Sequence, residues 1–247
     1  IGRAAGLDAV DLSVLFLKSL EPAYLKQMRK DIEAAGMTVA MVTSYPDYTH
    51  PDPVERERQI EQERAYIAAV GQLGGQMIRV TSGQAHPGLR EADGIRWALE
   101  GLRACEDAGL KAGVRLVLEN HGKPGCWQYT DFDQPTPIFL ALAEAIKGTS
   151  IGINFDTANP IAYGDDPLPI LQKVRQQVVS IHAADTETRG ALNHVLLGTG
   201  LVPFKQIFSY LKQTGFDGWI CMEENARQGE QGVKDAAAFI RKTWAEA

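Results

Sequence analysis

Three carboxylates and one imidazole stand at the ends of short apolar stretches and could together bind a metal ion. Glu119 ends LVLE, Asp156 ends INFD, His182 lies in VSIHAAD, and Glu223 follows WICM. Each stretch has a two-residue period that is typical of a β-strand, and each presents its polar residue at the C-terminal end. A mixed oxygen and nitrogen ligand set suits one divalent metal ion. Mn2+ or Mg2+ is the first choice, with Zn2+ and Co2+ as alternatives.

A bound cation explains this set better than an empty carboxylate cluster does. Three carboxylates crowded together would repel one another, and the pKa of at least one would rise. A dication removes the repulsion and leaves coordination positions for a substrate. Any one of the four residues alone could be a helix cap or a surface charge, so the hypothesis requires all four to meet at one point.

Strands and helices alternate along the whole chain. The strand patterns cover 9–13, 38–45, 76–83, 114–119, 150–156, 178–184 and 218–223. Helical patterns cover 21–36, 52–75, 94–113, 135–148, 167–177, 203–215 and 230–247, several with proline near the start. This alternation predicts a parallel sheet covered by helices, in a single domain spanning 1–247.

Seven strands are one fewer than a (β/α)8 TIM barrel needs. Residues 1–6 look like the tail of a helix that ends near Gly6, so we expect the first barrel strand to precede residue 1. The four ligand-bearing strands are then the fifth to the eighth. A doubly wound open sheet is the competing architecture, but it would spread the four strand ends along an edge, and no GxGxxG motif supports it.

Composition narrows the classes of partner. The 247 residues carry a net charge of −6, which disfavours a nucleic acid partner, and no apolar run reaches the roughly 20 residues of a membrane helix. Cys105, Cys126 and Cys221 are odd in number and form no CxxC, which indicates a reducing compartment such as the cytoplasm. The chain begins at Ile1 without methionine, so the sequence leaves open whether an N-terminal leader has been removed. A homo-oligomer is compatible with this composition.

Several motifs together resemble the xylose isomerase-like TIM barrels, specifically the sugar phosphate isomerase/epimerase group. The motifs are LVLENHG, INFDTAN, SIHAAD and GWICMEEN, together with LGTGLVPF at 197–204 and GLDAVDL near the start. The resemblance implies metal binding by Glu119, Asp156, His182 and Glu223. It also implies that Glu119 and Glu223 are the catalytic pair, which transfer protons through an enediolate of a small carbohydrate or keto-acid substrate.

Six further loop residues are candidate substrate-binding residues near the mouth of the predicted barrel. They are His121, Lys123, Asn159, Asp185, Arg189 and His194. Three positions depart from the pattern of the ketose 3-epimerases. Asn159 replaces a histidine, Gly125 replaces a second glutamate, and Arg189 stands one residue later than their arginine. These departures put a free ketohexose 3-epimerase in doubt and leave the metal ligands intact.

Other functions stay open at the level of sequence. A dehydratase of the inosose dehydratase type would use the same enediolate and expel a hydroxyl group. Phosphodiester hydrolysis as in endonuclease IV would require several additional histidines, and the chain has five in all. A non-catalytic sugar-binding barrel is disfavoured because all four candidate ligands are present.

Overall fold

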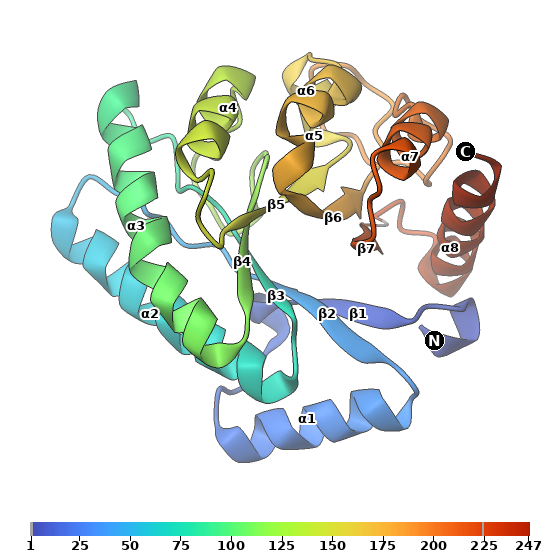
Figure 1. Cartoon of the computed structure of the whole chain (residues 1–247), viewed down its shortest axis with the longest axis horizontal. Coiled ribbons are helices and arrows are strands. Elements are labelled where there is room, and N and C mark those ends of the chain that lie inside the picture. The colour runs from blue at the N-terminus through green and yellow to red at the C-terminus, as the bar shows by residue number, and fades with distance from the viewer. Residues whose placement is uncertain (1, 224) are drawn as a thin grey trace. The chain divides into compact units, whose positions relative to one another are not determined.

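Seven strands form one sheet in the computed structural model, which describes residues 2–223 and 225–247 (Figure 1). They are β1 (Ala9–Ser13), β2 (Thr38–Thr43), β3 (Met77–Val80), β4 (Arg115–Glu119), β5 (Gly152–Asp156), β6 (Val178–Ala183) and β7 (Trp219–Met222). Their order in the sheet follows their order in the chain. The pairs β1–β2, β2–β3, β3–β4 and β6–β7 are parallel, so each connection between paired strands is a crossover.

Helices occupy these connections. The α-helices are α1 (Pro22–Ala34), α2 (Pro53–Leu73), α3 (Glu91–Ala112), α4 (Thr136–Ala145), α5 (Asn159–Tyr163), α6 (Pro167–Val174), α7 (Phe204–Gln213) and α8 (Gly229–Glu246). Short 3-10 turns are η1 (Arg3–Ala5), η2 (Val14–Phe16) and η3 (Arg175–Gln177). Among the described residues, no helix has both the length and the apolar character needed to span a bilayer.

The chain separates into two compact units, and the division falls within β5, between residues 153 and 154. The unit spanning 8–153 holds β1 to β4, and its helices α1, α2 and α3 pack in succession (Figure 1). Residues of β2, β3 and β4 such as Met41, Ile78 and Val117 are fully buried. Burial on both faces is the pattern of a parallel sheet covered by helices.

Local signals set the ends of α2, a long helix of this unit with a charged outer face. The carboxylate of Asp52 accepts a hydrogen bond from the amide of Val54 at 2.8 Å, and Pro53 occupies the first turn. Gly74 ends the helix in the left-handed conformation at φ 75°. These ends bring the chain directly into β3.

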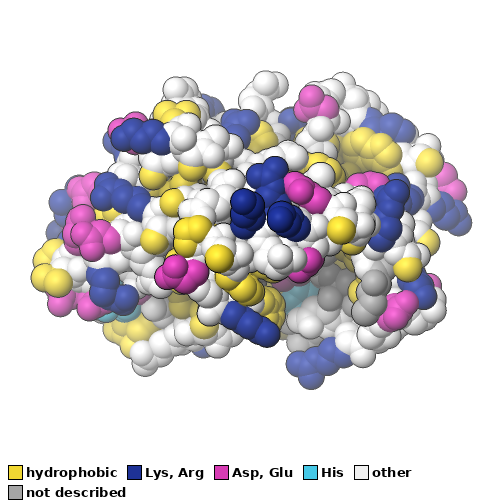
Figure 2. All heavy atoms as spheres, turned by 90° about the horizontal axis from the view of Figure 1, so that it is seen from below, with side chains coloured by type: hydrophobic (Ala, Val, Ile, Leu, Met, Phe, Trp, Pro, Cys, Tyr) yellow, Lys and Arg dark blue, Asp and Glu magenta, His cyan; other side chains and the backbone are white. Residues whose placement is uncertain are grey.

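The second unit contains residues 154–247 together with the N-terminal turn η1. Aromatic rings join α7 to α8: Phe204 lies 5.3 Å from Phe239, and Phe208 lies 5.5 Å from Trp244, between ring centroids. The guanidinium of Arg241 on α8 donates a hydrogen bond to the carbonyl of Gly6, which ties the start of the chain to its last helix. On the face drawn in Figure 2, basic and acidic side chains are interspersed.

All seven predicted strands are confirmed, with ends up to three residues shorter than expected. The predicted helix tail before Gly6 is a 3-10 turn, and Gly6 is left-handed at φ 80°. The predicted helix over 167–177 ends at Val174 and continues as η3. The short helix α5 was not predicted, and proline at a first-turn position starts this helix.

Close packing of α3 against Tyr48 makes Gly101 intolerant of a side chain. A Cβ at Gly101 would lie 2.3 Å from Cγ of the fully buried Tyr48 ring. We expect Gly101→Ala to lower the free energy of unfolding by about 1–3 kcal/mol, because overpacking exceeds the helix-propensity gain of about 1 kcal/mol. Urea denaturation measures this, with Gly125→Ala as control, since nothing lies within 4 Å of a Cβ there. Equal stability of both variants would contradict the packing argument.

Candidate metal centre

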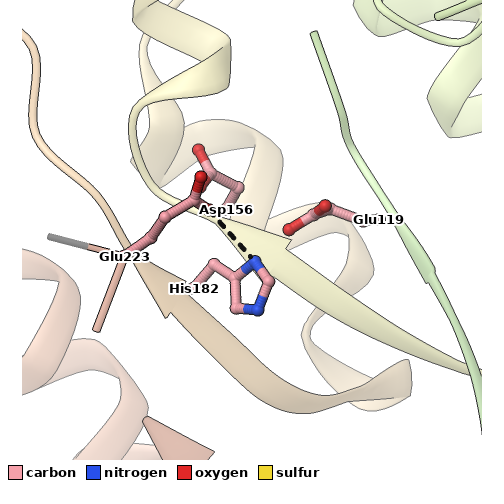
Figure 3. Close-up of side chains that lie close together, drawn as sticks. All are labelled: Glu119, Asp156, His182 and Glu223. Carbon is pink, nitrogen blue, oxygen red and sulfur yellow. Dashed lines mark ion pairs between the residues drawn. The ribbon is translucent and has the colours of Figure 1, made fainter. Parts of the chain in front are cut away.

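Asp156, His182 and Glu223 come together within the second unit (Figure 3). Asp156 is the last residue of β5, His182 is the fifth residue of β6, and Glu223 directly follows β7. Each offers one candidate ligand atom, and these atoms lie within 4.8 Å of one another. Ligand atoms at about 2.0–2.6 Å from one ion are separated by such distances, so the donor set fits a divalent metal.

The carboxylate of Asp156 is held by the start of α5. Its Oδ1 accepts hydrogen bonds from the backbone amides of Ala158 at 2.8 Å and Asn159 at 2.6 Å. Amides at the start of a helix stabilise a negative charge, so this buried carboxylate keeps one orientation. The short helix therefore positions a candidate ligand.

The imidazole of His182 faces Glu223, with 3.4 Å between Nδ1 and Oε2. The backbone around His182 is fixed by Thr157, whose amide donates to the carbonyl of His182 at 3.0 Å and whose hydroxyl donates to the carbonyl of Ala184 at 2.7 Å. These contacts hold the C-terminal ends of β5 and β6 together. The two ligand-bearing strand ends therefore share one hydrogen-bonded frame.

Exposure differs sharply among the three side chains. Asp156 and His182 are buried, whereas the side chain of Glu223 is 48% exposed. Glu223 is therefore the member of this group with the most access to solvent and to small molecules.

Glu119 lies at the end of β4 in the other unit and is fully buried. Its Oε2 forms an ion pair with Nε of Arg79 on β3, at 3.0 Å. A buried carboxylate is costly unless a charge or hydrogen bonds compensate it, and Arg79 supplies that compensation. Arg79 is a charged residue within the otherwise apolar strand QMIRV, but the sequence alone does not identify Glu119 as its partner.

Asn159 and His194 carry unsatisfied buried atoms in the second unit. Oδ1 of Asn159 and Nδ1 of His194 are buried and have no hydrogen-bond partner among the residues that the structure describes. Buried polar atoms normally find a partner. Both residues are therefore suited to the predicted contact with a polar substrate.

Asp185 and Arg189 hold loops in place, and the substrate contact predicted for them stays a prediction. The carboxylate of Asp185 accepts four backbone amides, from Thr186, Gly198, Gly200 and Val202, at 2.9–3.1 Å. Arg189 is exposed and donates to the carbonyl of Gly164 at 2.9 Å and to Asp166 at 2.8 Å. Their hydrogen-bonding capacity is directed at the chain itself.

His121 and Lys123 follow Glu119 in the loop after β4. Nδ1 of His121 lies 3.7 Å from Oδ2 of the buried Asp131, and Lys123 is exposed. Their roles in substrate binding stay predictions.

A group of buried acids near this loop escaped the sequence analysis. Burial raises the pKa of Asp131 to about 7, although the hydroxyl of Ser82 donates to it at 2.5 Å. Burial and the neighbouring Asp131 raise the pKa of Asp133 well above its usual range. In the same unit, burial raises the pKa of Glu63 to about 8. The pair of acids in TDFDQ was a signal, but only burial in the folded chain makes it unusual.

A model of the xylose isomerase-like TIM barrel family matches residues 2–243. The chain belongs to this family. The predicted α/β fold of the TIM barrel class is therefore confirmed, with seven parallel strands and their covering helices in the described residues.

Relatives within the xylose isomerase-like family have several activities. A putative hydroxypyruvate isomerase of Streptomyces coelicolor is 26% identical over 235 residues, covering 89% of this chain and 81% of that protein. An inosose dehydratase of Lacticaseibacillus casei is 24% identical over 139 residues, and the match spans 50% of this chain and 44% of the dehydratase's length. The solved structure of an IOLI protein with a binding zinc atom has a TM-score of 0.81 and 15% identity, covering 99% of this chain and 91% of that one. Ketose epimerases also share the fold.

Glu63 should make the stability of the protein depend on pH. Its folded-state pKa of about 8 lies above the unfolded value of about 4.3, so the unfolded chain loses this proton first as pH rises. The stability present below about pH 4.3 is therefore lost as pH increases toward 8. We expect the free energy of unfolding of Glu63→Gln to rise by about 1–3 kcal/mol relative to that of the unsubstituted protein between pH 5 and 8.5.

Denaturant titrations at several pH values measure this difference, and Glu61→Gln on the exposed face of α2 is the matched control. Parallel stability curves for Glu63→Gln and the unsubstituted protein would contradict the raised pKa.

Proposed function

We propose that this protein is a divalent-metal-dependent isomerase or epimerase of a small polyhydroxylated sugar or keto-acid. The observation that carries the proposal is the convergence of Asp156, His182 and Glu223 at adjoining strand ends, with ligand atoms within 4.8 Å. Carboxyl ends of parallel strands are where TIM barrels place their chemistry. The relatives named above, which include an isomerase and epimerases, support the same reading.

We propose that Glu119 completes this ligand set, so that four residues hold one metal ion. Glu119 occupies the C-terminal end of β4, which neighbours β5 in the strand order, and Asp156 ends β5. Its buried carboxylate lies beside the guanidinium of Arg79. Mn2+ or Mg2+ suits the carboxylate-rich set, and the zinc of the IOLI structure supports Zn2+ as an alternative.

The metal, when bound, polarises the substrate carbonyl and its neighbouring hydroxyl, which lowers the cost of forming an enediolate. The chain's own carboxylates then move the proton. We propose that Glu223, the exposed member of the set, exchanges a proton with a substrate carbon on one side, and that Glu119 serves the opposite side. Asp156 stays fixed by the amides of α5 and takes no part in proton transfer.

Substrate hydroxyls would meet the unsatisfied atoms of Asn159 and His194. Oδ1 of Asn159 accepts from a hydroxyl, while Nδ1 of His194 either donates or accepts, depending on its tautomer. The hydroxyl groups of a polyhydroxylated molecule can form both of these hydrogen bonds. His121 and Lys123 are proposed to contribute to substrate binding from the loop after β4.

We also propose a cytoplasmic location, because all three cysteines are free thiols.

A metal-dependent dehydratase is the second candidate function. The match to inosose dehydratase favours it, and the same enediolate leads to loss of water when a hydroxyl stands β to the carbonyl. Product analysis separates the two functions, because an isomerase conserves the mass of its substrate and a dehydratase lowers it by one water.

Exchange with solvent tests the proton-transfer roles. The Mn2+-loaded protein is incubated in D2O with each member of a panel of ketoses and keto-acids. We expect deuterium to be incorporated next to the carbonyl of the substrate, and NMR measures this incorporation. Glu223→Gln should slow this exchange about 10²- to 10⁴-fold, since general acid–base catalysis contributes that much. The exposed Glu187→Gln is the matched control and should exchange normally. Full exchange by both Glu223→Gln and Glu119→Gln would refute the roles assigned here.

A further inference from the structure

Arg79 is a buried cation directly beside a proposed metal ligand. Arg79 is 3% exposed and lies within β3. The parallel register pairs Arg79 with Val117, so the side chain of Arg79 emerges on the same face as those of Val117 and Glu119. Glu119 is one side-chain layer further along, and the side chains meet at 3.0 Å between Nε and Oε2.

Contacts other than Glu119 fix the orientation of this guanidinium. Its Nη1 donates a hydrogen bond to the carbonyl of Ser44 at 3.1 Å, and its Cζ lies 4.7 Å from the centre of the Tyr45 ring. Ser44 is itself held, since its amide donates to the carbonyl of Arg79 at 2.8 Å and its hydroxyl donates to Glu63 at 2.7 Å. The residues that follow β2 therefore hold the guanidinium of Arg79 in place independently of its ion pair with Glu119.

Several buried acids surround Arg79, but the close ion pair is made with Glu119. Arg79 acts on Glu63 and Asp131 as a nearby charge, and burial still raises the pKa of both groups. The direct contact of Nε is with Oε2 of Glu119. Arg79 is therefore in direct contact with a carboxylate that belongs to the proposed ligand set.

We propose that Arg79 is a positioning residue that acts as a resident counter-cation of Glu119 and weakens the hold of the site on its metal ion. This inference rests on the proposed metal site. With Oε2 engaged by Arg79, an ion bound by the other carboxylate oxygen of Glu119 would lie about 6 Å from the guanidinium. A single and a double positive charge at that distance repel even at the dielectric constant of water, by an amount equivalent to about tenfold in affinity.

Two consequences follow for the ion. Without metal, Arg79 balances the buried charge of Glu119 and holds its carboxylate in place. With metal, Arg79 competes for the same carboxylate, so the ion stays exchangeable. A neutral residue at position 79 should therefore destabilise the metal-free protein and tighten metal binding.

Calorimetric titration of the full chain with Mn2+ alone tests this. We expect Arg79→Met to bind Mn2+ about tenfold more tightly than the unsubstituted protein, and Arg79→Lys, which keeps the charge, to bind within about threefold of it. The metal-free melting temperature of Arg79→Met should fall, and its rise on adding Mn2+ should exceed that of the unsubstituted protein. If Arg79→Met fails to fold, Arg79→Gln keeps polar contacts without the charge and should shift affinity in the same direction.

Arg175→Met is the matched control. Arg175 is also a buried arginine, donating to Thr214 at 2.6 Å and lying over the Phe216 ring, and it is not part of the proposed site. Its loss should lower the melting temperature and leave Mn2+ affinity unchanged. Unchanged or weaker Mn2+ binding by both neutral variants at position 79 would overturn the inference alone. Failure of the unsubstituted protein to bind any divalent ion would overturn the proposed function and the inference together.

Discussion

Buried negative charge is the constraint that shapes the strand ends of this protein. Glu119 and Asp156 have almost no exposure to solvent, and isolated carboxylates are very costly in such surroundings. Each has its own compensation: Asp156 accepts two amides at the start of α5, and Glu119 pairs with Arg79. Other buried acids, such as Asp131 and Glu63, respond through a raised pKa.

The fold gives these residues their place through the direction of its strands. Parallel strands end at the same edge of a sheet, so a polar residue at the end of each strand meets its neighbours there. The loops that follow are held by their own side chains, as Asp185 shows by accepting four backbone amides. A frame of this kind can carry different loops, and with them different substrates, on the same set of strands. The range of activities among the relatives agrees with that view.

Most of the architecture could be predicted because it depends on local patterns. Two-residue periods placed all seven strands, and proline and glycine signals placed seven helices to within three residues at every end. The candidate ligands followed from the same periods, since Asp156 ends its strand and Glu223 follows its own. The short helix α5 was missed because five residues carry too little periodicity to be recognised.

By itself, the sequence determined the order of strands and helices and indicated four candidate metal ligands, because alternation and strand ends are properties of neighbouring residues. Only the tertiary structure decided which side chains compensate one another. Arg79 meets Glu119 across 40 positions of the chain, and the carboxylate of Asp185 accepts amides of its own loop. Such partners depend on the packing of separate strands and loops, and burial then gives each contact its energy.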